Sequence, residues 1–475
     1  MATAKRRSEN ITSLPSVMRN NYYSFLLLIA ASIFSLLYSL LSLIRHSHFQ
    51  SGAFDLGLYD QAVWHYSTFT YPFNTIKMRM ILGDHLTLTL PLLAPLFWIW
   101  DDVRILLIFQ AVWVSFSILP LFHYLLKRGL ERSESLLLCV LYLSFYGMQY
   151  GLFFDFHPVF IAVGLLPWLL LWWETKGWKW FIVTTILFLL TQENMGLSLS
   201  AVGILWLFEK KRIKLAGMLI ALGILTSLIS FGAIRLFSDV GLEYTPHLPN
   251  NPIEFVTRFF DAPEKRQVLL YSFSWYSFLP LFSIGALLAV TSDLAQYFIT
   301  GDAFSRMWSP FMHHRAILSL YLLLGVVVIL KELKKRKINT VFVVVGMTIL
   351  TIFQQYYFHL PLNKLAKREF WQEEQWMQDN RTILSKIPQG AAVAAQQSLV
   401  PHLSHRKEIY LIYPRTRSFN TTGDFCEANS CWWLDFAGKP DLLVVDTHPG
   451  VWLTMTLAEE NQFNEALTTM ERAHA

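Results

Sequence analysis

The sequence predicts an α-helical polytopic membrane protein with a small α/β domain at its C-terminal end. Hydrophobic residues make up 54% of the chain and charged residues only 15%, whereas a soluble domain carries about 25% charged residues. Apolar runs of about 17 to 25 residues, the length that crosses a bilayer, recur along the chain. Short basic clusters separate these runs, as membrane topology requires, so the net charge of +5 does not indicate a nucleic-acid partner.

Residues 1–22 are predicted to form a cytoplasmic tail, and residues 23–360 a transmembrane domain. The basic clusters at residues 127–132, 176–179, 210–214 and 331–337 all face the cytoplasm by the positive-inside rule. The expected spans are Tyr23–Leu43, Arg104–Leu126, Ser135–Phe153, His157–Trp173, Trp178–Thr191, Met195–Phe208, Leu215–Phe237, Ala316–Leu330 and Ile338–Leu360.

This orientation restricts the remaining apolar segments. If the first span crosses outward, the chain must cross back once before Lys127, which is predicted to be cytoplasmic. Arg104–Leu126 supplies that crossing, so His85–Trp100 is predicted to be a re-entrant or interfacial helix. Its two prolines, Pro91 and Pro95, favour the same interpretation. Gln267–Phe298 is interrupted at Pro280 and is predicted to form a helical hairpin. The prediction is then about eleven crossings plus a re-entrant helix, with the N-terminus cytoplasmic and the C-terminus external.

The first external loop, residues 45–103, is the leading candidate for a functional site. It carries Asp55, Asp60, Asp84 and His85 next to sequence that must enter lipid. A carboxylate near hydrocarbon is costly unless it is paired, bound to a metal or used in chemistry. From the residues alone, Asp60 as a helix cap and Asp84 with His85 as a turn remain open alternatives.

Further polar residues are predicted at the same external end. Acids and histidines that gather opposite the basic loops are typical of an active site that opens to the exterior. For the acids, the alternative to a functional role is an ordinary loop or a position that faces water. For His313 and His314, the alternative is a position at the membrane interface. The polar residues predicted at this end are Asp155, His157, Glu193, Arg235, Arg306, His313, His314 and Arg315.

Residues 361–475 are predicted to form an external α/β domain. Strand candidates at Ala391–Ala395, Glu408–Tyr413 and Asp441–Asp446 alternate with helices, the last at Leu457–Arg472. Because the N-terminus is predicted to be cytoplasmic and the number of crossings is odd, this domain is predicted to lie on the external side. There Cys426 and Cys431 either form a disulfide or remain two thiols.

Five motifs in combination carry a resemblance. They are GAFDLGLYDQAVW, GDHLTLTLPLLAPLF, FDFHP, a glutamate before the next span, and LVPHLSHRKEIYLIYP. From about Gly52 to Asp446 the chain resembles the DUF2079 family of uncharacterised membrane proteins, which is grouped with the GT-C glycosyltransferases. The sequence departs from the family at residues 192–194, Gln-Glu-Asn in place of Lys-Glu-Asp, and at Met312–Arg315, where a tyrosine-flanked histidine is usual.

The resemblance implies a GT-C-like fold, a polyprenyl-phosphate-linked sugar donor and an essential acid in the first external loop. Carried over, Asp55 would be this first-loop acidic residue, able to act as the base, and Asp60 its neighbour. Mg²⁺ or Mn²⁺ would suit the oxygen-rich ligands among Asp84, His85, Asp155, His157 and Glu193. Contacts to the donor phosphate would come from Arg235, Arg306, His313, His314 and Arg315.

The sequence therefore predicts a glycosyltransferase of the cell membrane whose partners are the bilayer and a lipid-linked sugar. Two other classes remain open. A lipid or small-solute transporter or flippase would show inverted internal repeats and polar groups near mid-membrane, and we find no such repeat in the sequence. A non-catalytic assembly or sensor protein would bind a partner through the C-terminal domain.

Overall fold

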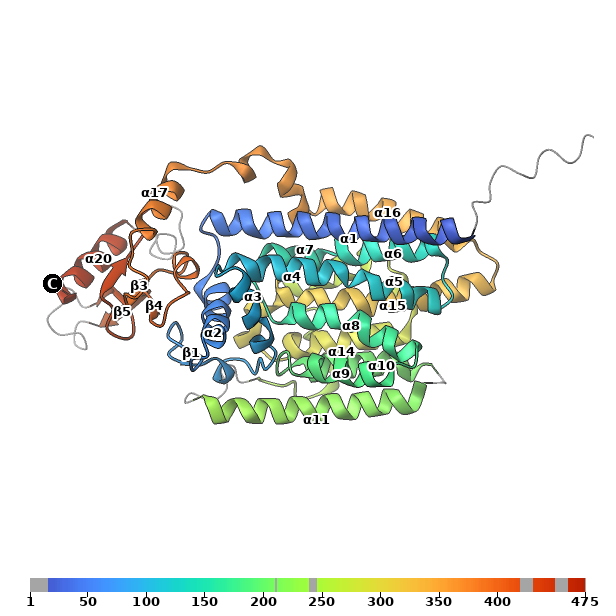
Figure 1. The fold of residues 1–475 in the computed structure, drawn as a ribbon. Coiled ribbons are helices and arrows are strands. Elements are labelled where there is room, and N and C mark those ends of the chain that lie inside the picture. The colour runs from blue at the N-terminus through green and yellow to red at the C-terminus, as the bar shows by residue number, and fades with distance from the viewer. Residues whose placement is uncertain (1–15, 210–211, 239–245, 419–429, 449–459, 475) are drawn as a thin grey trace, which may run out of the picture.

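The computed structural model describes the chain except residues 1–15, 210–211, 239–245, 419–429, 449–459 and 475. Figure 1 shows a bundle of helices with the C-terminal domain stacked on one end. The bundle contains α1 (Ser16–Ser47), α4 (Arg104–Phe116), α5 (Ile118–Lys127), α6 (Arg132–Ser144), α7 (Tyr146–Phe153), α8 (Val159–Glu174), α9 (Trp178–Leu189), α10 (Met195–Leu207), α11 (Ile213–Phe237), α13 (Pro263–Trp275), α14 (Ile284–Phe298), α15 (Leu318–Lys335) and α16 (Thr340–Tyr357).

The chain is a helical membrane protein. Within the described residues five helical segments are long and apolar enough to cross a bilayer, and a sixth results if α6 and α7, which meet at 45°, count as one span. Helices α8, α9, α10 and α14 are apolar but shorter. The total of eleven crossings and the orientation of the termini therefore stay predictions.

The helices break where the sequence supplies a physical cause. Helix α4 ends at Phe116 because Pro120, four residues later, has no N–H to donate to the Phe116 carbonyl. Between α6 and α7, Phe145 is extended and its buried ring packs on Trp275. The predicted hairpin consists of α13 and α14, and the chain reverses at Ser277 and Phe278, which have positive φ.

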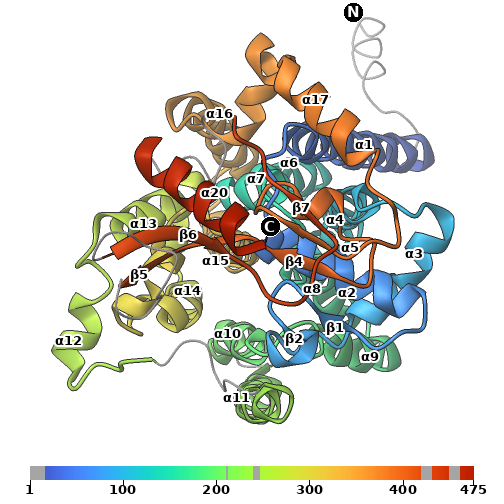
Figure 2. The same ribbon diagram turned by 90° about the vertical axis from the view of Figure 1, so that its left-hand side faces the viewer.

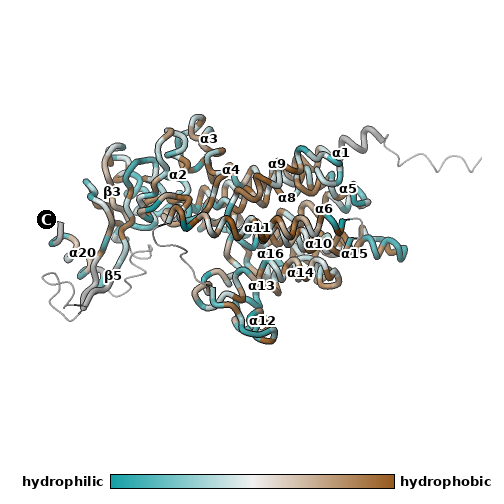
Figure 3. Tube along the Cα trace, turned by 90° about the horizontal axis from the view of Figure 1, so that it is seen from below, coloured by the Kyte–Doolittle hydropathy of each residue, from teal (hydrophilic) through white to brown (hydrophobic). Residues whose placement is uncertain are grey.

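Burial separates inner from outer helices. The span that contains α15 is 72% buried, whereas the spans of α1, α11 and α16 are 28%, 22% and 28% buried. Because those outer helices are also strongly apolar, their exposed faces suit lipid rather than water. The apolar colour runs along the bundle in Figure 3, and polar residues lie mainly at its ends.

The first loop folds at the end of the bundle where α1 finishes (Figure 1). It contains α2 (Leu58–Ser67), strands β1 (Phe73–Asn74) and β2 (Arg79–Met80), and α3 (Ala94–Ile99). The segment predicted to be re-entrant forms a 3₁₀ turn at Leu90–Leu93 followed by α3, and Trp98 and Ile99 there are 61% and 81% exposed. The basic ends of α5 and α15 lie at the opposite end of the bundle (Figure 1).

The C-terminal domain contains a three-stranded parallel sheet. Its order is β4 (Ile409–Leu411), β3 (Val393–Ala395), β7 (Leu442–Val444), so each predicted strand segment contributes one strand. Strands β5 (Tyr413–Ser418) and β6 (Ser430–Asp435) pair antiparallel, and the helices are α17 (Gln375–Leu384) and α20 (Glu460–His474). Of the two cysteines for which a disulfide or two thiols were left open, Cys426 lies outside the described residues.

The first loop and the C-terminal domain share one hydrophobic core. Phe49, Ala53 and Ile76 of the loop pack with Val393 and Ile409 of the sheet. Thr75 adds polar contacts, because its hydroxyl donates to the Ile409 carbonyl (2.7 Å) and accepts from the Ile409 N–H (3.0 Å). Figure 2 shows the sheet in front of the end of the bundle. The C-terminal domain is therefore fixed to the loop that carries Asp55.

An ion triad adds to this attachment. Nε2 of His405 lies 3.0 Å from fully buried Asp60 on α2, and Nδ1 lies 2.7 Å from Asp101 after α3. Burial alone lowers the pKa of His405, but the two carboxylates raise it to about 9. The charged ring therefore stabilises the docked domain fully below pH 6.5, and this stabilisation is lost as pH rises through about 9.

We expect the melting temperature of the detergent-solubilised protein, followed by tryptophan fluorescence, to fall between about pH 7 and about pH 10. His405→Gln should have a lower melting temperature at neutral pH and a flatter pH profile. His123→Gln, on the exposed side of α5, is the control and should behave as wild type. Identical pH profiles for His405→Gln and wild type would contradict the triad's role.

Candidate functional site

Asp55 lies in a widened helical turn that opens the first loop. The π-helix Ala53–Gly57 closes when the Gly57 N–H donates to the Gly52 carbonyl, five residues earlier (3.1 Å). Turns of this kind are frequent at functional sites because the extra residue redirects a side chain. Here the Asp55 carboxylate meets Nε2 of His157 at 3.0 Å.

His157 is held by the loop between α7 and α8. Its Nδ1 lies 3.0 Å from the Asp155 carbonyl, which can only accept, so Nδ1 is the donor. Nε2 is thereby left to share a proton with the Asp55 carboxylate. The His157 ring also stacks on His313, with ring centroids 3.6 Å apart. Asp55, His157 and His313 thus form one continuous group from three distant segments.

Asp155 secures this group to the end of α1. Its fully buried carboxylate accepts from Arg45 (2.5 Å) and from the Gly52 N–H (2.7 Å). Gln110 of α4 braces the same loop through the Asp155 carbonyl and the His157 N–H, both at 3.3 Å. Asp155 is therefore a structural partner of Arg45.

A second group of charges adjoins Asp55. Asp84 lies 2.7 Å from Lys77 and 3.6 Å from Arg79, two basic residues at and just before β2. His85 lies 2.8 Å from Glu193, whose other oxygen accepts from the Leu86 N–H (3.1 Å). The ring of Tyr59 lies between the groups, with its centroid 6.5 Å from that of His85 and 6.1 Å from that of His157.

Solvent access distinguishes Asp55 from the other acids of the cluster. The Asp55 side chain is 31% exposed, whereas those of Asp84, Asp155 and Glu193 are 3%, 0% and 9% exposed. Each of the three buried acids is paired with a basic side chain, as burial of charge requires. Among these four carboxylates, Asp55 is the one that a substrate can reach.

The charges of the cluster follow from its pairings. Burial by itself raises the pKa of Asp55, but the hydrogen bond from His157 and the nearby charges of His157, Arg45 and Lys77 bring it below its usual value. Burial lowers the pKa of His85, yet the carboxylates of Glu193 and Asp84 raise it to about 9. At neutral pH the cluster therefore presents an ionised Asp55 beside a protonated His85.

The five residues predicted to bind a metal do not come together as a ligand set. Among the described residues no three His, Cys, Asp or Glu side chains form a group suited to a metal ion. Asp84 and Asp155 are occupied by Lys77 and Arg45, and His85 by Glu193. The arrangement does not fit a preformed Mg²⁺ or Mn²⁺ site, so this cofactor stays an untested prediction.

Asp60 is placed away from Asp55's partners. It accepts from Ser404 and pairs with His405, both in the C-terminal domain. The structure therefore gives the two predicted catalytic acids different surroundings: Asp55 faces His157, and Asp60 attaches the C-terminal domain.

Part of the predicted phosphate-binding set adjoins the cluster. His313 packs on His157 and on His314, and His314 packs on Tyr297. Arg315 is fully buried and donates to backbone carbonyls of Met307 and Ser309. Arg235, in the last turn of α11, and Arg306 are exposed.

Arg45, Lys77 and Arg79 were not among the predicted site residues. Lys77 and Arg79 were detectable, because two basic residues in a predicted external loop run against the positive-inside bias. Arg45 carried no such signal, since a basic residue at the end of a span is ordinary.

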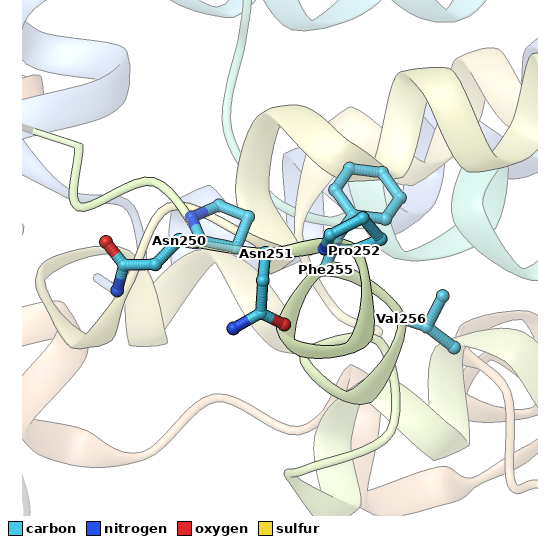
Figure 4. Close-up of a pocket in the computed structure, with 6 residues that line it drawn as sticks. Asn250, Asn251, Pro252, Phe255 and Val256 are labelled. Carbon is cyan, nitrogen blue, oxygen red and sulfur yellow. The ribbon is translucent and has the colours of Figure 1, made fainter.

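A hollow elsewhere on the surface lacks this chemistry. It lies beside the short helix α12 (Pro252–Thr257), and none of its lining residues is titratable (Figure 4). The Asn251 side chain there caps α12 by accepting from the Glu254 N–H (2.9 Å). Its lining residues are Pro249, Asn250, Asn251, Pro252, Phe255 and Val256.

The described residues thus form a bundle of apolar helices with a charged cluster at one end, which is the architecture of a helical membrane protein. A family model described as a predicted membrane protein, DUF2079, matches residues 45–435. The chain therefore belongs to the DUF2079 family, as its motifs predicted. A search of curated proteins finds no match.

We expect Arg45→Met to lower the yield of folded protein strongly, because it leaves the Asp155 carboxylate buried without its cation at a cost of about 3–5 kcal/mol. Asp155→Asn combined with Arg45→Met should recover much of the loss, because both charges are then absent. Arg104→Met, which removes the arginine of an exposed pair with Asp102, is the control. Size-exclusion chromatography of detergent extracts measures folded yield, and equal yields for the single and double variants would refute the pairing.

Proposed function

We propose that the chain is a GT-C-type glycosyltransferase that transfers a sugar from a polyprenyl-phosphate-linked donor to an acceptor hydroxyl at the external face of the cell membrane. The observation that carries the proposal is the selective access to Asp55. A catalytic base must reach the substrate, and the other three acids of the cluster are buried and paired. In this proposal the N-terminus is cytoplasmic, the C-terminal domain external, and about eleven crossings complete the topology.

The proposed reaction is a single displacement. The acceptor oxygen attacks the anomeric carbon of the donor, and a new carbon–oxygen bond forms. The bond from that carbon to the phosphate oxygen breaks, and polyprenyl phosphate leaves with the bonding electron pair. Asp55 takes the acceptor proton, while His157 holds the carboxylate in place. One base and one leaving group favour inversion at the anomeric carbon.

The second charged group supports donor binding. Lys77 and Arg79 both lie beside Asp84, so positive side chains gather on this side of the site. His85 adds a further positive charge at neutral pH, since its pKa is raised to about 9. Positive groups next to a general base are what a departing phosphate requires. We therefore assign the donor phosphate to Lys77, Arg79 and His85 in place of the predicted arginines.

Asp55→Asn should reduce the sugar-bearing product at least about 100-fold, because the amide cannot accept the acceptor proton. Glycolipid and glycan profiling of cells with matched membrane levels of wild type, a deletion and Asp55→Asn measures this. Glu264→Gln, an exposed acid at the start of α13, is the matched control and should retain the product. Product lost in the deletion but retained in Asp55→Asn would favour a flippase that supplies another enzyme.

Lys77→Met and Arg79→Met should each weaken binding of undecaprenyl phosphate by about tenfold, because each removes one charge-assisted contact. Arg235→Met removes an equal charge from the exposed end of α11 and should leave binding unchanged. Calorimetric titration of the purified protein measures the affinity. A loss confined to Arg235→Met would place the donor phosphate elsewhere.

A further inference from the structure

The turn that follows β3 brings the C-terminal domain to the Asp55 site. Gln396 and Gln397 come directly after the central strand of the parallel sheet. The Gln396 side chain is used within the domain: its Oε1 accepts from the Asp446 N–H (3.0 Å), and its Nε2 donates to Ser398 (3.1 Å). Gln396 thereby ties the ends of β3 and β7 together and fixes the position of its neighbour.

The Gln397 amide lies next to the catalytic loop. A methyl group at Gly52 would be 3.0 Å from Nε2 of Gln397, 3.5 Å from Oδ2 of Asp155 and 3.7 Å from Oδ2 of Asp55. A residue of the C-terminal domain therefore lies beside Gly52, next to the turn that carries the proposed base. The carboxyl edge of a parallel sheet is also where α/β domains commonly bind ligands.

Among the residues that the structure describes, none donates to the carbonyl end of this amide. Oε1 of Gln397 is buried and accepts no hydrogen bond from any described residue. Buried amide oxygens in folded proteins nearly always have a donor, and an exception at a reactive site indicates a place for a ligand's donor group. The acids beside Gln397 cannot supply it, because an ionised carboxylate only accepts.

Resting on the proposed function, we infer that Gln397 binds the acceptor, and that the acceptor is a sugar or a similar polyhydroxylated molecule. The amide oxygen accepts from one hydroxyl, and the amide N–H donates to the same or a neighbouring one. An uncharged amide suits hydroxyls, whereas the donor phosphate suits Lys77 and Arg79. Asp55 lies near both the Gln397 amide and Lys77. A base that takes the acceptor proton while the phosphate leaves needs such a position.

The test uses the full-length protein in detergent and two kinds of probe. Methyl glucoside, methyl galactoside and methyl mannoside represent the acceptor, and undecaprenyl phosphate represents the donor. Gln397→Met keeps the length of the side chain but removes both hydrogen-bonding groups. It should weaken methyl glycoside binding by about tenfold and leave undecaprenyl phosphate binding unchanged.

Two further variants sharpen the result. Gly52→Ala places a methyl group 3.0 Å from the Gln397 amide, so it should displace the amide and weaken methyl glycoside binding in the same direction. Gln378→Met makes the identical chemical change on the exposed side of α17 and should have no effect.

Equal methyl glycoside affinities for wild type and Gln397→Met would overturn the inference. So would the absence of saturable binding of all three methyl glycosides to wild type. Wild-type protein that binds a methyl glycoside through Gln397 but does not bind undecaprenyl phosphate would support the sugar site and contradict the proposed donor. The two proposals thus fail separately.

Discussion

The buried carboxylate of Asp155 is the interaction on which the site depends. It joins the guanidinium of Arg45, at the end of α1, to the backbone N–H of Gly52. Gly52 precedes the turn that carries Asp55, and His157 follows Asp155 by two residues, so one carboxylate sets both sides of the Asp55–His157 contact. A charge buried next to apolar helices is tolerated only with such partners, and this requirement makes the geometry specific.

The cluster separates structural charge from reactive charge. Asp155, Asp84 and Glu193 are buried and paired with Arg45, Lys77 and His85, so their desolvation is offset within the protein. Asp55 is ionised, held by His157 and partly exposed. The charges of Arg45 and Lys77, which pair with two of these acids, also lower the pKa of Asp55. In the proposed reaction, cations near the base favour an anionic leaving group.

The C-terminal domain is part of the site's construction. Its sheet shares a hydrophobic core with the first loop, and its His405 pairs with Asp60 of α2. Val400 also packs against Gly57, at the end of the turn that carries Asp55. Removal of this domain would expose the core of the loop and release the turn. The loop, the bundle and the C-terminal domain therefore act as one unit in holding Asp55.

The membrane class, the helical segments and the three strand segments of the parallel sheet could be predicted from the sequence. These depend on composition and short-range pattern, because hydrocarbon excludes polar residues and each strand is a local apolar run. Tertiary structure alone decided which charges pair. Arg45 meets Asp155 across 110 positions, and Asp60 meets His405 across 345. No local pattern encodes such contacts, because they form only when the folded helices and loops exclude water around each charge and leave one partner within reach.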